Sequence, residues 1–256
     1  MLSYAVAVPV GVFLGLLVNY LAEILPRLRE GAENVPAAAD EVKAPDALRP
    51  ASRVLLSPRG VISILLVIGA SVYLVTREGL SFTWAILLAY CVFFVLISVI
   101  DLEHRLVLDS VMIPAFVFAL IEVFLSGRQR PLNALGGFAI GQIVVMAFYL
   151  LGHVYLWLIN TGRPEDKRVD EVAFGFGDVT LATFCGLVVG FPGVIPMLVL
   201  MVLAGGIIAL AYLLVRGLVM HNYRAHTPLP YGPSIVVAAL VMLLWGEQVA
   251  RLLSAS

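Results

Sequence analysis

Long apolar stretches separated by short polar loops dominate the pattern of this chain. Apolar runs of about 17 to 25 residues can cross a bilayer as helices. The pattern predicts eight such helices, near residues 3–25, 60–76, 82–100, 108–126, 132–159, 178–191, 193–215 and 230–250. The sixth run is short, and only the turn Phe191-Pro192-Gly193 separates it from the seventh. We therefore predict an all-α, polytopic integral membrane protein.

Positively charged residues predict the orientation of these helices, because Lys and Arg in short loops favour the cytoplasmic side. Of the 16 Lys and Arg residues, 12 fall in the first, third, fifth and seventh loops and 4 on the other side. This bias predicts that both termini lie outside. It also supports a break between the sixth and seventh runs, since one merged span would move the last loop to the other side.

Composition agrees with a membrane protein. The chain is 61% hydrophobic and 13% charged, whereas a soluble domain is about half apolar and about a quarter charged. Cys91 and Cys185 both lie in apolar runs and are too few for a disulfide framework or a four-thiolate zinc site, so we expect small buried hydrophobes. The net charge of -1 argues neither for nor against a charged partner. The one long loop, residues 26–59, is rich in Ala, Pro, Asp and Glu and predicts a poorly ordered cytoplasmic segment.

Two carboxylates stand at the ends of apolar runs. Asp101 closes the third run in SVIDLEHRLVLD, and Asp178 opens the sixth run in GFGDVTL. The predicted orientation brings both to the cytoplasmic face at similar depth. A charge at the centre of a membrane helix costs about 2.5 to 3.5 kcal/mol on insertion scales, so such an acid tends to face a wet cavity or a partner. Two acids that share a site hold one proton between them and can activate a water molecule against a peptide carbonyl.

The glycines before Asp178 allow two interpretations. Gly175 and Gly177 lack a Cβ, so they predict unusual backbone dihedrals and close approach of a substrate strand. Taken by itself, however, Gly-x-Gly-Asp ahead of a helix is more often an ordinary helix cap. A dinucleotide-binding fingerprint is excluded, because its third glycine would fall at Thr180.

At this point the motifs resemble a known family. IDLEHRLVLD, FGFGDVTL and HTPLPYGPSIVVAALVMLLWG, in this order over residues 82–250, resemble the bacterial type IV prepilin peptidases, which are membrane aspartyl proteases of the GxGD type. The resemblance implies that Asp101 and Asp178 are catalytic and that Gly175 and Gly177 support them. It implies cleavage of the basic leader of prepilins or pseudopilins at the cytoplasmic face of the bacterial inner membrane, for pilus assembly or protein secretion.

The same resemblance implies the partners and the domain organisation. Proteolysis would need no metal and no cofactor; the partners would be prepilins and membrane lipid, without nucleic acid. Residues 1–59 are interpreted as a first membrane helix with a shortened cytoplasmic loop, a degenerate methyltransferase-type region, and residues 60–256 as the peptidase membrane domain. Bifunctional members carry two CxxC pairs in the first loop, which here contains no cysteine. S-adenosylmethionine would be a cofactor only if N-methylation is retained.

The chain departs from the family pattern at two positions near the acids. Leu108-Asp109 replaces the usual Pro-Asp, and Thr180 replaces the lysine of GxGDxKL. We interpret Asp109 as a cap of the fourth helix, with a substrate role as the alternative. Arg105 lies in a short loop, where it is solvated or contacts an acid or a lipid phosphate.

We expect other ionisable residues to have structural or electrostatic roles. We expect Glu122 and His153 to form a structural pair. The acidic residues of the fifth loop are either solvated or attract a basic leader; they are Asp166, Asp170 and Glu171.

Two other functions remain open. A proton-coupled transporter would use the two acids as a proton relay, but the outer half offers no chain of acids that continues from them. A catalytically inactive scaffold for pilus assembly is the second alternative. The retention of both aspartates argues against it, while Thr180 keeps it open.

Overall fold

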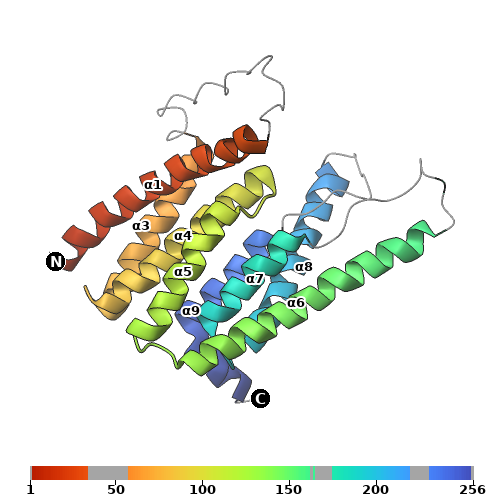
Figure 1. Cartoon of the computed structure of the whole chain (residues 1–256). Helices are drawn as coiled ribbons and strands as arrows, with labels where there is room; N and C mark the ends of the chain where they lie inside the picture. The colour runs from red at the N-terminus through yellow and green to blue at the C-terminus, as the bar shows by residue number, and fades with distance from the viewer. Residues whose placement is uncertain (1, 34–56, 162–163, 165–174, 220–230, 255–256) are drawn as a thin grey trace. The chain divides into compact units, whose positions relative to one another are not determined.

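The computed structural model describes residues 2–33, 57–161, 164, 175–219 and 231–254 (Figure 1). All regular elements within these residues are helices. They are α1 (Leu2–Glu33), α3 (Pro58–Glu78), α4 (Phe82–His104), α5 (Asp109–Leu125), α6 (Pro131–Asn160), α7 (Phe176–Val189), α8 (Val194–Val219) and α9 (Gly232–Ser254). The predicted all-α class is confirmed, and each predicted apolar run corresponds to one helix.

The helices differ in their capacity to cross a membrane. Within the described residues, six are long and apolar enough to do so, namely α1, α3, α4, α6, α8 and α9. Helix α5 has 17 residues and α7 has 14. At about 1.5 Å per residue, α7 is about 21 Å long, which is shorter than the hydrocarbon core of about 30 Å. The sixth run is therefore the shortest helix, as predicted. The position of the termini outside stays a prediction.

The chain packs as two compact units, Met1–Val111 and Met112–Ser256. Helices α1, α3 and α4 belong to the first unit, and α6 to α9 belong to the second. The predicted division into residues 1–59 and 60–256 separated two activities rather than two packing units, and it stays a prediction.

Small residues in α1 let it approach α3 closely. A Cβ added to Gly11 would lie 2.9 Å from Ile68 Cα, and one added to Gly15 would lie 2.8 Å from Ile64 Cα. Close backbone approach at small residues is typical of membrane helix pairs. Asn19 strengthens the same interface: its buried Nδ2 donates to Gly15 O at 3.0 Å, to Gly60 O at 3.2 Å and to Ser63 Oγ at 2.8 Å. Asn19 therefore joins α1 to α3.

Helix α7 is the buried centre of the second unit, although it is the shortest helix. It packs against both α6 and α9. Its residues from Leu181 to Val188 are all buried. Glycines bring α6 and α7 together, since a Cβ on Gly137 would lie 2.1 Å from Gly186 O and one on Gly186 would lie 2.4 Å from Gly137 O. Asp178 thus stands in the first turn of the most enclosed helix of its unit.

We predict that Gly186→Leu destabilises the protein by about 1 to 3 kcal/mol, or more, because the new side chain cannot enter the α6–α7 contact without moving backbone. The measurement is the midpoint of thermal unfolding in detergent, which should fall by about 2 to 4 °C per kcal/mol. Gly206→Leu is the matched control, because nothing lies within 4 Å of a Cβ at Gly206. Equal midpoints for the two variants would contradict the close contact.

An ion pair between Glu122 and Arg128 lies at the C-terminal end of α7. Arg128 Nε donates to Glu122 Oε1 at 3.0 Å, and its Nη2 donates to Glu122 Oε2 at 3.3 Å and to Val188 O at 2.9 Å. Gln129 Nε2 donates to Leu187 O at 3.0 Å. The loop after α5 thereby satisfies carbonyl groups at the C-terminus of α7, which a helix alone leaves without partners.

The predicted pair of Glu122 and His153 is wrong. Glu122 lies near the end of α5 and pairs with Arg128. His153 is exposed, its Nδ1 lies 2.9 Å from Tyr149 O, and its ring contacts the Tyr149 ring. Only a short loop joins α5 to α6, and His153 lies about 33 Å along α6 from its first residue at about 1.5 Å per residue. Glu122 therefore lies beside the α5–α6 loop, whereas His153 lies near the far end of α6.

Candidate active site

Asp178 is part of the start of α7. The helix begins at Phe176 after Gly175, which has φ -80° and ψ 160°. Asp178 Oδ2 accepts the Gly175 N–H at 3.0 Å, and the Asp178 N–H donates to Gly175 O at 3.1 Å. This reciprocal arrangement occupies a free donor of the helix start, and the helix dipole favours the ionised carboxylate there. The interpretation of GFGD as a helix start is confirmed, and the carboxylate remains half-buried rather than enclosed.

The predicted unusual dihedrals of the two glycines are wrong. Gly175 has an extended backbone that any residue can adopt, and Gly177 lies inside α7. Within the described residues, positive φ among glycines occurs at Gly79, Gly127 and Gly190. A Cβ at Gly175 would meet Asp178 Oδ2 at 3.7 Å, which is an ordinary contact. The absence of a side chain beside the carboxylate is therefore what Gly175 contributes, and close approach of a substrate stays a prediction.

Asp101 lies in the last turn of α4 and is 5% exposed. Its carbonyl oxygen accepts the Arg105 N–H at 2.8 Å. Arg105 ends the helix in the left-handed region, with φ 54° and ψ 40°, and its side chain is exposed. Asp101 is thus held in a buried position at a defined helix end.

A network of charged side chains fixes the end of α4 within the first unit. Arg59, in the first turn of α3, pairs with Glu103, two residues after Asp101. The Arg59 Nη2 also lies 3.3 Å from Glu23 Oε2, and Glu23 pairs with Arg27 one turn further along α1. These contacts join α1, α3 and α4 next to Asp101. The sequence contained a signal for this network, because the predicted orientation places all four charged residues at the cytoplasmic ends of their helices.

The segment that holds both acids matches a known family. The model of the type IV leader peptidase family matches residues 86–210, which include Asp101 and Asp178. Through this segment the chain is similar to the type IV leader peptidase family.

Curated prepilin leader peptidases are identical to the chain at about a quarter of the aligned positions. The prepilin leader peptidase/N-methyltransferase of Aeromonas hydrophila is 27% identical over 171 residues, which cover 66% of this chain and 52% of the relative. The protein of the same name from Stutzerimonas stutzeri is 28% identical over 152 residues, which cover 59% and 46%. The chain thus spans about half the length of the curated relatives that it matches. No solved structure matches it.

The two positions where the chain departs from the leader peptidase pattern near the acids both lie near the start of a helix. Thr180 Oγ1 donates to Phe176 O at 3.2 Å, so a neutral hydroxyl bonded to its own helix replaces the usual lysine. Asp109 is the first residue of α5 and is exposed, and a carboxylate in a first turn stabilises the helix through its dipole. Neither residue adds a positive charge to the candidate site.

One polar contact near Asp178 was missed by the sequence analysis. Thr183 Oγ1 lies 2.6 Å from Gln142 Oε1 of α6 and donates to Val179 O at 2.7 Å. It stands little more than one turn after Asp178, on the face of α7 that packs against α6. The sequence shows two polar residues in otherwise apolar runs, which indicates that each needs a polar partner. Only the packing of α6 against α7 shows that they contact each other.

Several predictions about the site lie elsewhere in the chain. The acidic residues of the fifth loop, Asp166, Asp170 and Glu171, fall outside the described residues. In the described part, no group of three or more His, Cys, Asp or Glu residues is arranged to hold a metal ion. Cys91 and Cys185 are buried and free, which confirms their interpretation as small hydrophobes. Asp101 belongs to the first unit and Asp178 to the second, and their convergence stays a prediction.

Proposed function

We propose that the chain is a two-aspartate endopeptidase that removes the basic leader from type IV prepilins or pseudopilins at the cytoplasmic face of the inner membrane. The observation that carries the proposal is the family match over residues 86–210, which contains both acids at helix ends. The name of these relatives, prepilin leader peptidase/N-methyltransferase, indicates the substrate class that we propose.

The surroundings of the two carboxylates favour different roles for them. Asp178 accepts an N–H at the start of a helix, where the dipole stabilises the ionised form, so it suits the general base. Asp101 is almost fully buried in the last turn of α4, and we assign it the role of the protonated partner. The two residues together would provide the one ionised and one protonated acid that the reaction needs.

The proposed reaction then balances without a covalent enzyme intermediate. Asp178 takes a proton from water as the water oxygen bonds to the scissile carbonyl carbon, and Asp101 gives its proton to the carbonyl oxygen. The tetrahedral diol collapses, the C–N bond breaks, and Asp178 returns its proton to the leaving nitrogen. Asp101 recovers a proton from the diol hydroxyl. The apolar helix of the substrate would remain in the membrane while its basic leader reaches the two acids from the cytoplasm.

The test is incubation of the purified chain in detergent with candidate prepilins and pseudopilins, followed by mass spectrometry of the substrate. We expect loss of the leader in the absence of any ion gradient. A proton-coupled transporter would leave the substrate intact under these conditions. An inactive scaffold would retain the substrate during purification and leave it uncut.

N-methylation of the new N-terminus is a second candidate activity, because the relatives' names include it. The same mass spectra decide it, since one methyl group adds about 14 Da in the presence of S-adenosylmethionine. Cleavage without this addition would indicate a peptidase alone.

A further inference from the structure

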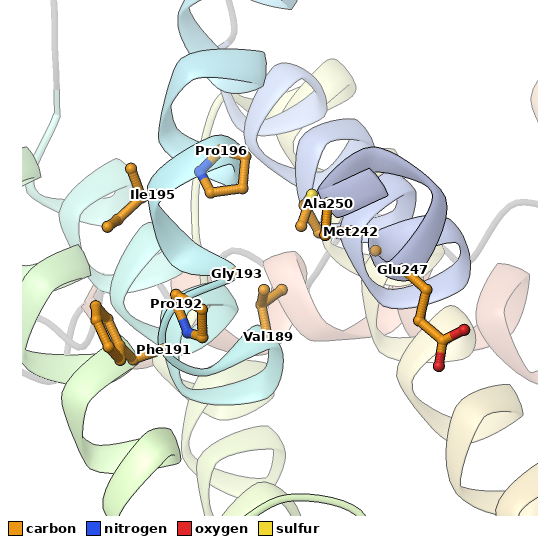
Figure 2. Close-up of a pocket in the computed structure, with 10 residues that line it drawn as sticks. Val189, Phe191, Pro192, Gly193, Ile195, Pro196, Met242, Glu247 and Ala250 are labelled. Atoms are coloured by element: carbon orange, nitrogen blue, oxygen red, sulfur yellow. The ribbon is translucent and has the colours of Figure 1, made fainter. Parts of the chain in front are cut away.

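A cavity of about 640 Å³ lies in the second unit. Figure 2 shows the side chains that line it. Its walls come from the turn between α7 and α8, the first turn of α8 and the last half of α9. The walls are mostly apolar, with Phe191, Pro192, Ile195, Pro196 and Met242 among the lining residues. Glu247 is the one charged residue that lines the cavity.

The cavity is separate from the candidate active site. It adjoins Val189 at the last residue of α7, whereas Asp178 lies in the first turn of the same helix. The two positions are 11 residues apart, which corresponds to about 16 Å along the helix at about 1.5 Å per residue. In the predicted orientation, this end of α7 faces the outer leaflet.

The helices around the cavity indicate what reaches it. Both α8 and α9 are long and apolar enough to cross a membrane, so lipid acyl chains would contact their outward faces. Trp245, beside the lining residues, is 39% exposed, and tryptophan favours the level of lipid headgroups. Glu247, two residues further, therefore lies where a lipid places its headgroup, with the apolar walls available to an acyl chain.

The charges beside the cavity distinguish between headgroups. Glu247 is exposed and presents a carboxylate, which repels an anionic headgroup and accepts hydrogen bonds from an ammonium group. Arg251 lies one turn later on α9, with its Nε 3.4 Å from Glu247 O, and its guanidinium suits a phosphate. An acid and a base in succession match a headgroup that carries an ammonium and a phosphate in succession.

We propose that this cavity binds a phospholipid with a primary ammonium headgroup, phosphatidylethanolamine. Its acyl chain lies against Pro192 and Met242, and its ammonium donates to the Glu247 carboxylate. Helix α9 changes direction at Trp245, where φ is -130° and ψ is 21°. The bound lipid thus joins the last segment of α9 to the turn between α7 and α8.

The test is native mass spectrometry of the purified full chain after exchange into a mild detergent with equal amounts of phosphatidylethanolamine and phosphatidylglycerol. We expect the wild type to retain phosphatidylethanolamine in preference to phosphatidylglycerol. Glu247→Gln should lower this preference about two- to fivefold, which corresponds to about 0.4 to 1 kcal/mol at 1.4 kcal/mol per tenfold change.

Two further variants test where the lipid binds. Ala250→Phe should fill the cavity from an exposed position and lower retention of both lipids. Glu78→Gln, at the last residue of α3 in the first unit, removes a carboxylate from another helix end and should leave lipid retention unchanged. Equal retention of the two lipids by the wild type, or the same preference in Glu247→Gln, would overturn the proposal. So would unchanged retention in an Ala250→Phe variant with a normal unfolding midpoint.

Discussion

Asp178→Asn is expected to abolish leader removal while it changes the free energy of unfolding by no more than about 1 kcal/mol. The side-chain oxygen of asparagine can accept the same Gly175 N–H that Asp178 Oδ2 accepts at 3.0 Å, so the hydrogen bond at the helix start is kept. Asparagine cannot take a proton from water. Loss of a general acid or base costs about 10²- to 10⁴-fold in rate, and loss of a group that acts as a unit with another costs more.

The comparison with Asp178→Ala separates the two roles of this residue. Alanine removes both the helix-start hydrogen bond and the acid, so the variant should lose activity and also about 0.5 to 1.5 kcal/mol of stability. The measurements are the rate of leader removal by mass shift and the midpoint of thermal unfolding. An active Asp178→Asn beside an inactive Asp178→Ala would show that Asp178 serves the helix start alone.

Two other aspartates complete this experiment. Asp101→Asn should be as inactive as Asp178→Asn, because either residue alone cannot supply both the base and the acid. Asp109→Asn is the matched control: it changes an exposed acid in the first turn of α5, and we expect it to retain activity. Activity in Asp101→Asn would contradict the two-aspartate mechanism.

Arg128→Met is expected to destabilise the protein by about 2 to 4 kcal/mol. The side chain of Glu122 is 1% exposed and pairs with Arg128, which is 22% exposed. Removing one partner leaves a buried charge without compensation, which costs about 3 to 5 kcal/mol for a fully buried pair and less here, because Arg128 is partly exposed. The substitution also removes the hydrogen bond to Val188 O at the end of α7.

The measurement is thermal unfolding in detergent, where we expect the midpoint to fall by about 5 to 15 °C at about 2 to 4 °C per kcal/mol. Arg130→Met is the control, because Arg130 is exposed and its substitution removes a charge from the same loop. The double variant Glu122→Gln with Arg128→Met should recover part of the loss, since it leaves no buried charge unpaired. Additive losses in the double variant would contradict the pairing.

The sequence located the helices because a bilayer imposes a local requirement. A membrane helix must be apolar over a fixed length, since its backbone satisfies its own hydrogen bonds and its side chains face lipid. Each predicted run therefore corresponds to one helix, even at the turn Phe191-Pro192-Gly193 between α7 and α8. The start of α7 at GFGD was equally local, because a glycine and an acid three residues later suffice to begin a helix.

Partners across helices could not be predicted in the same way. Lipid tails are as apolar as most side chains, so hydrophobicity does not select which helices pack together. That selection depends on backbone approach, as at Gly137 and Gly186, and on polar contacts. Glu122 illustrates the consequence: from the sequence it was assigned to His153, whereas in the fold Arg128 reaches it from the following loop.

The sequence by itself determined an all-α membrane chain with Asp101 and Asp178 at helix ends, because the length of apolar runs and the start of a helix are properties of neighbouring residues. Only the tertiary structure decided that Arg59 joins α1 and α4 beside Asp101, and that α7 is enclosed by α6 and α9. It alone placed Glu247 beside an apolar cavity. These contacts join residues far apart along the chain, and their geometry depends on how closely the helix backbones approach.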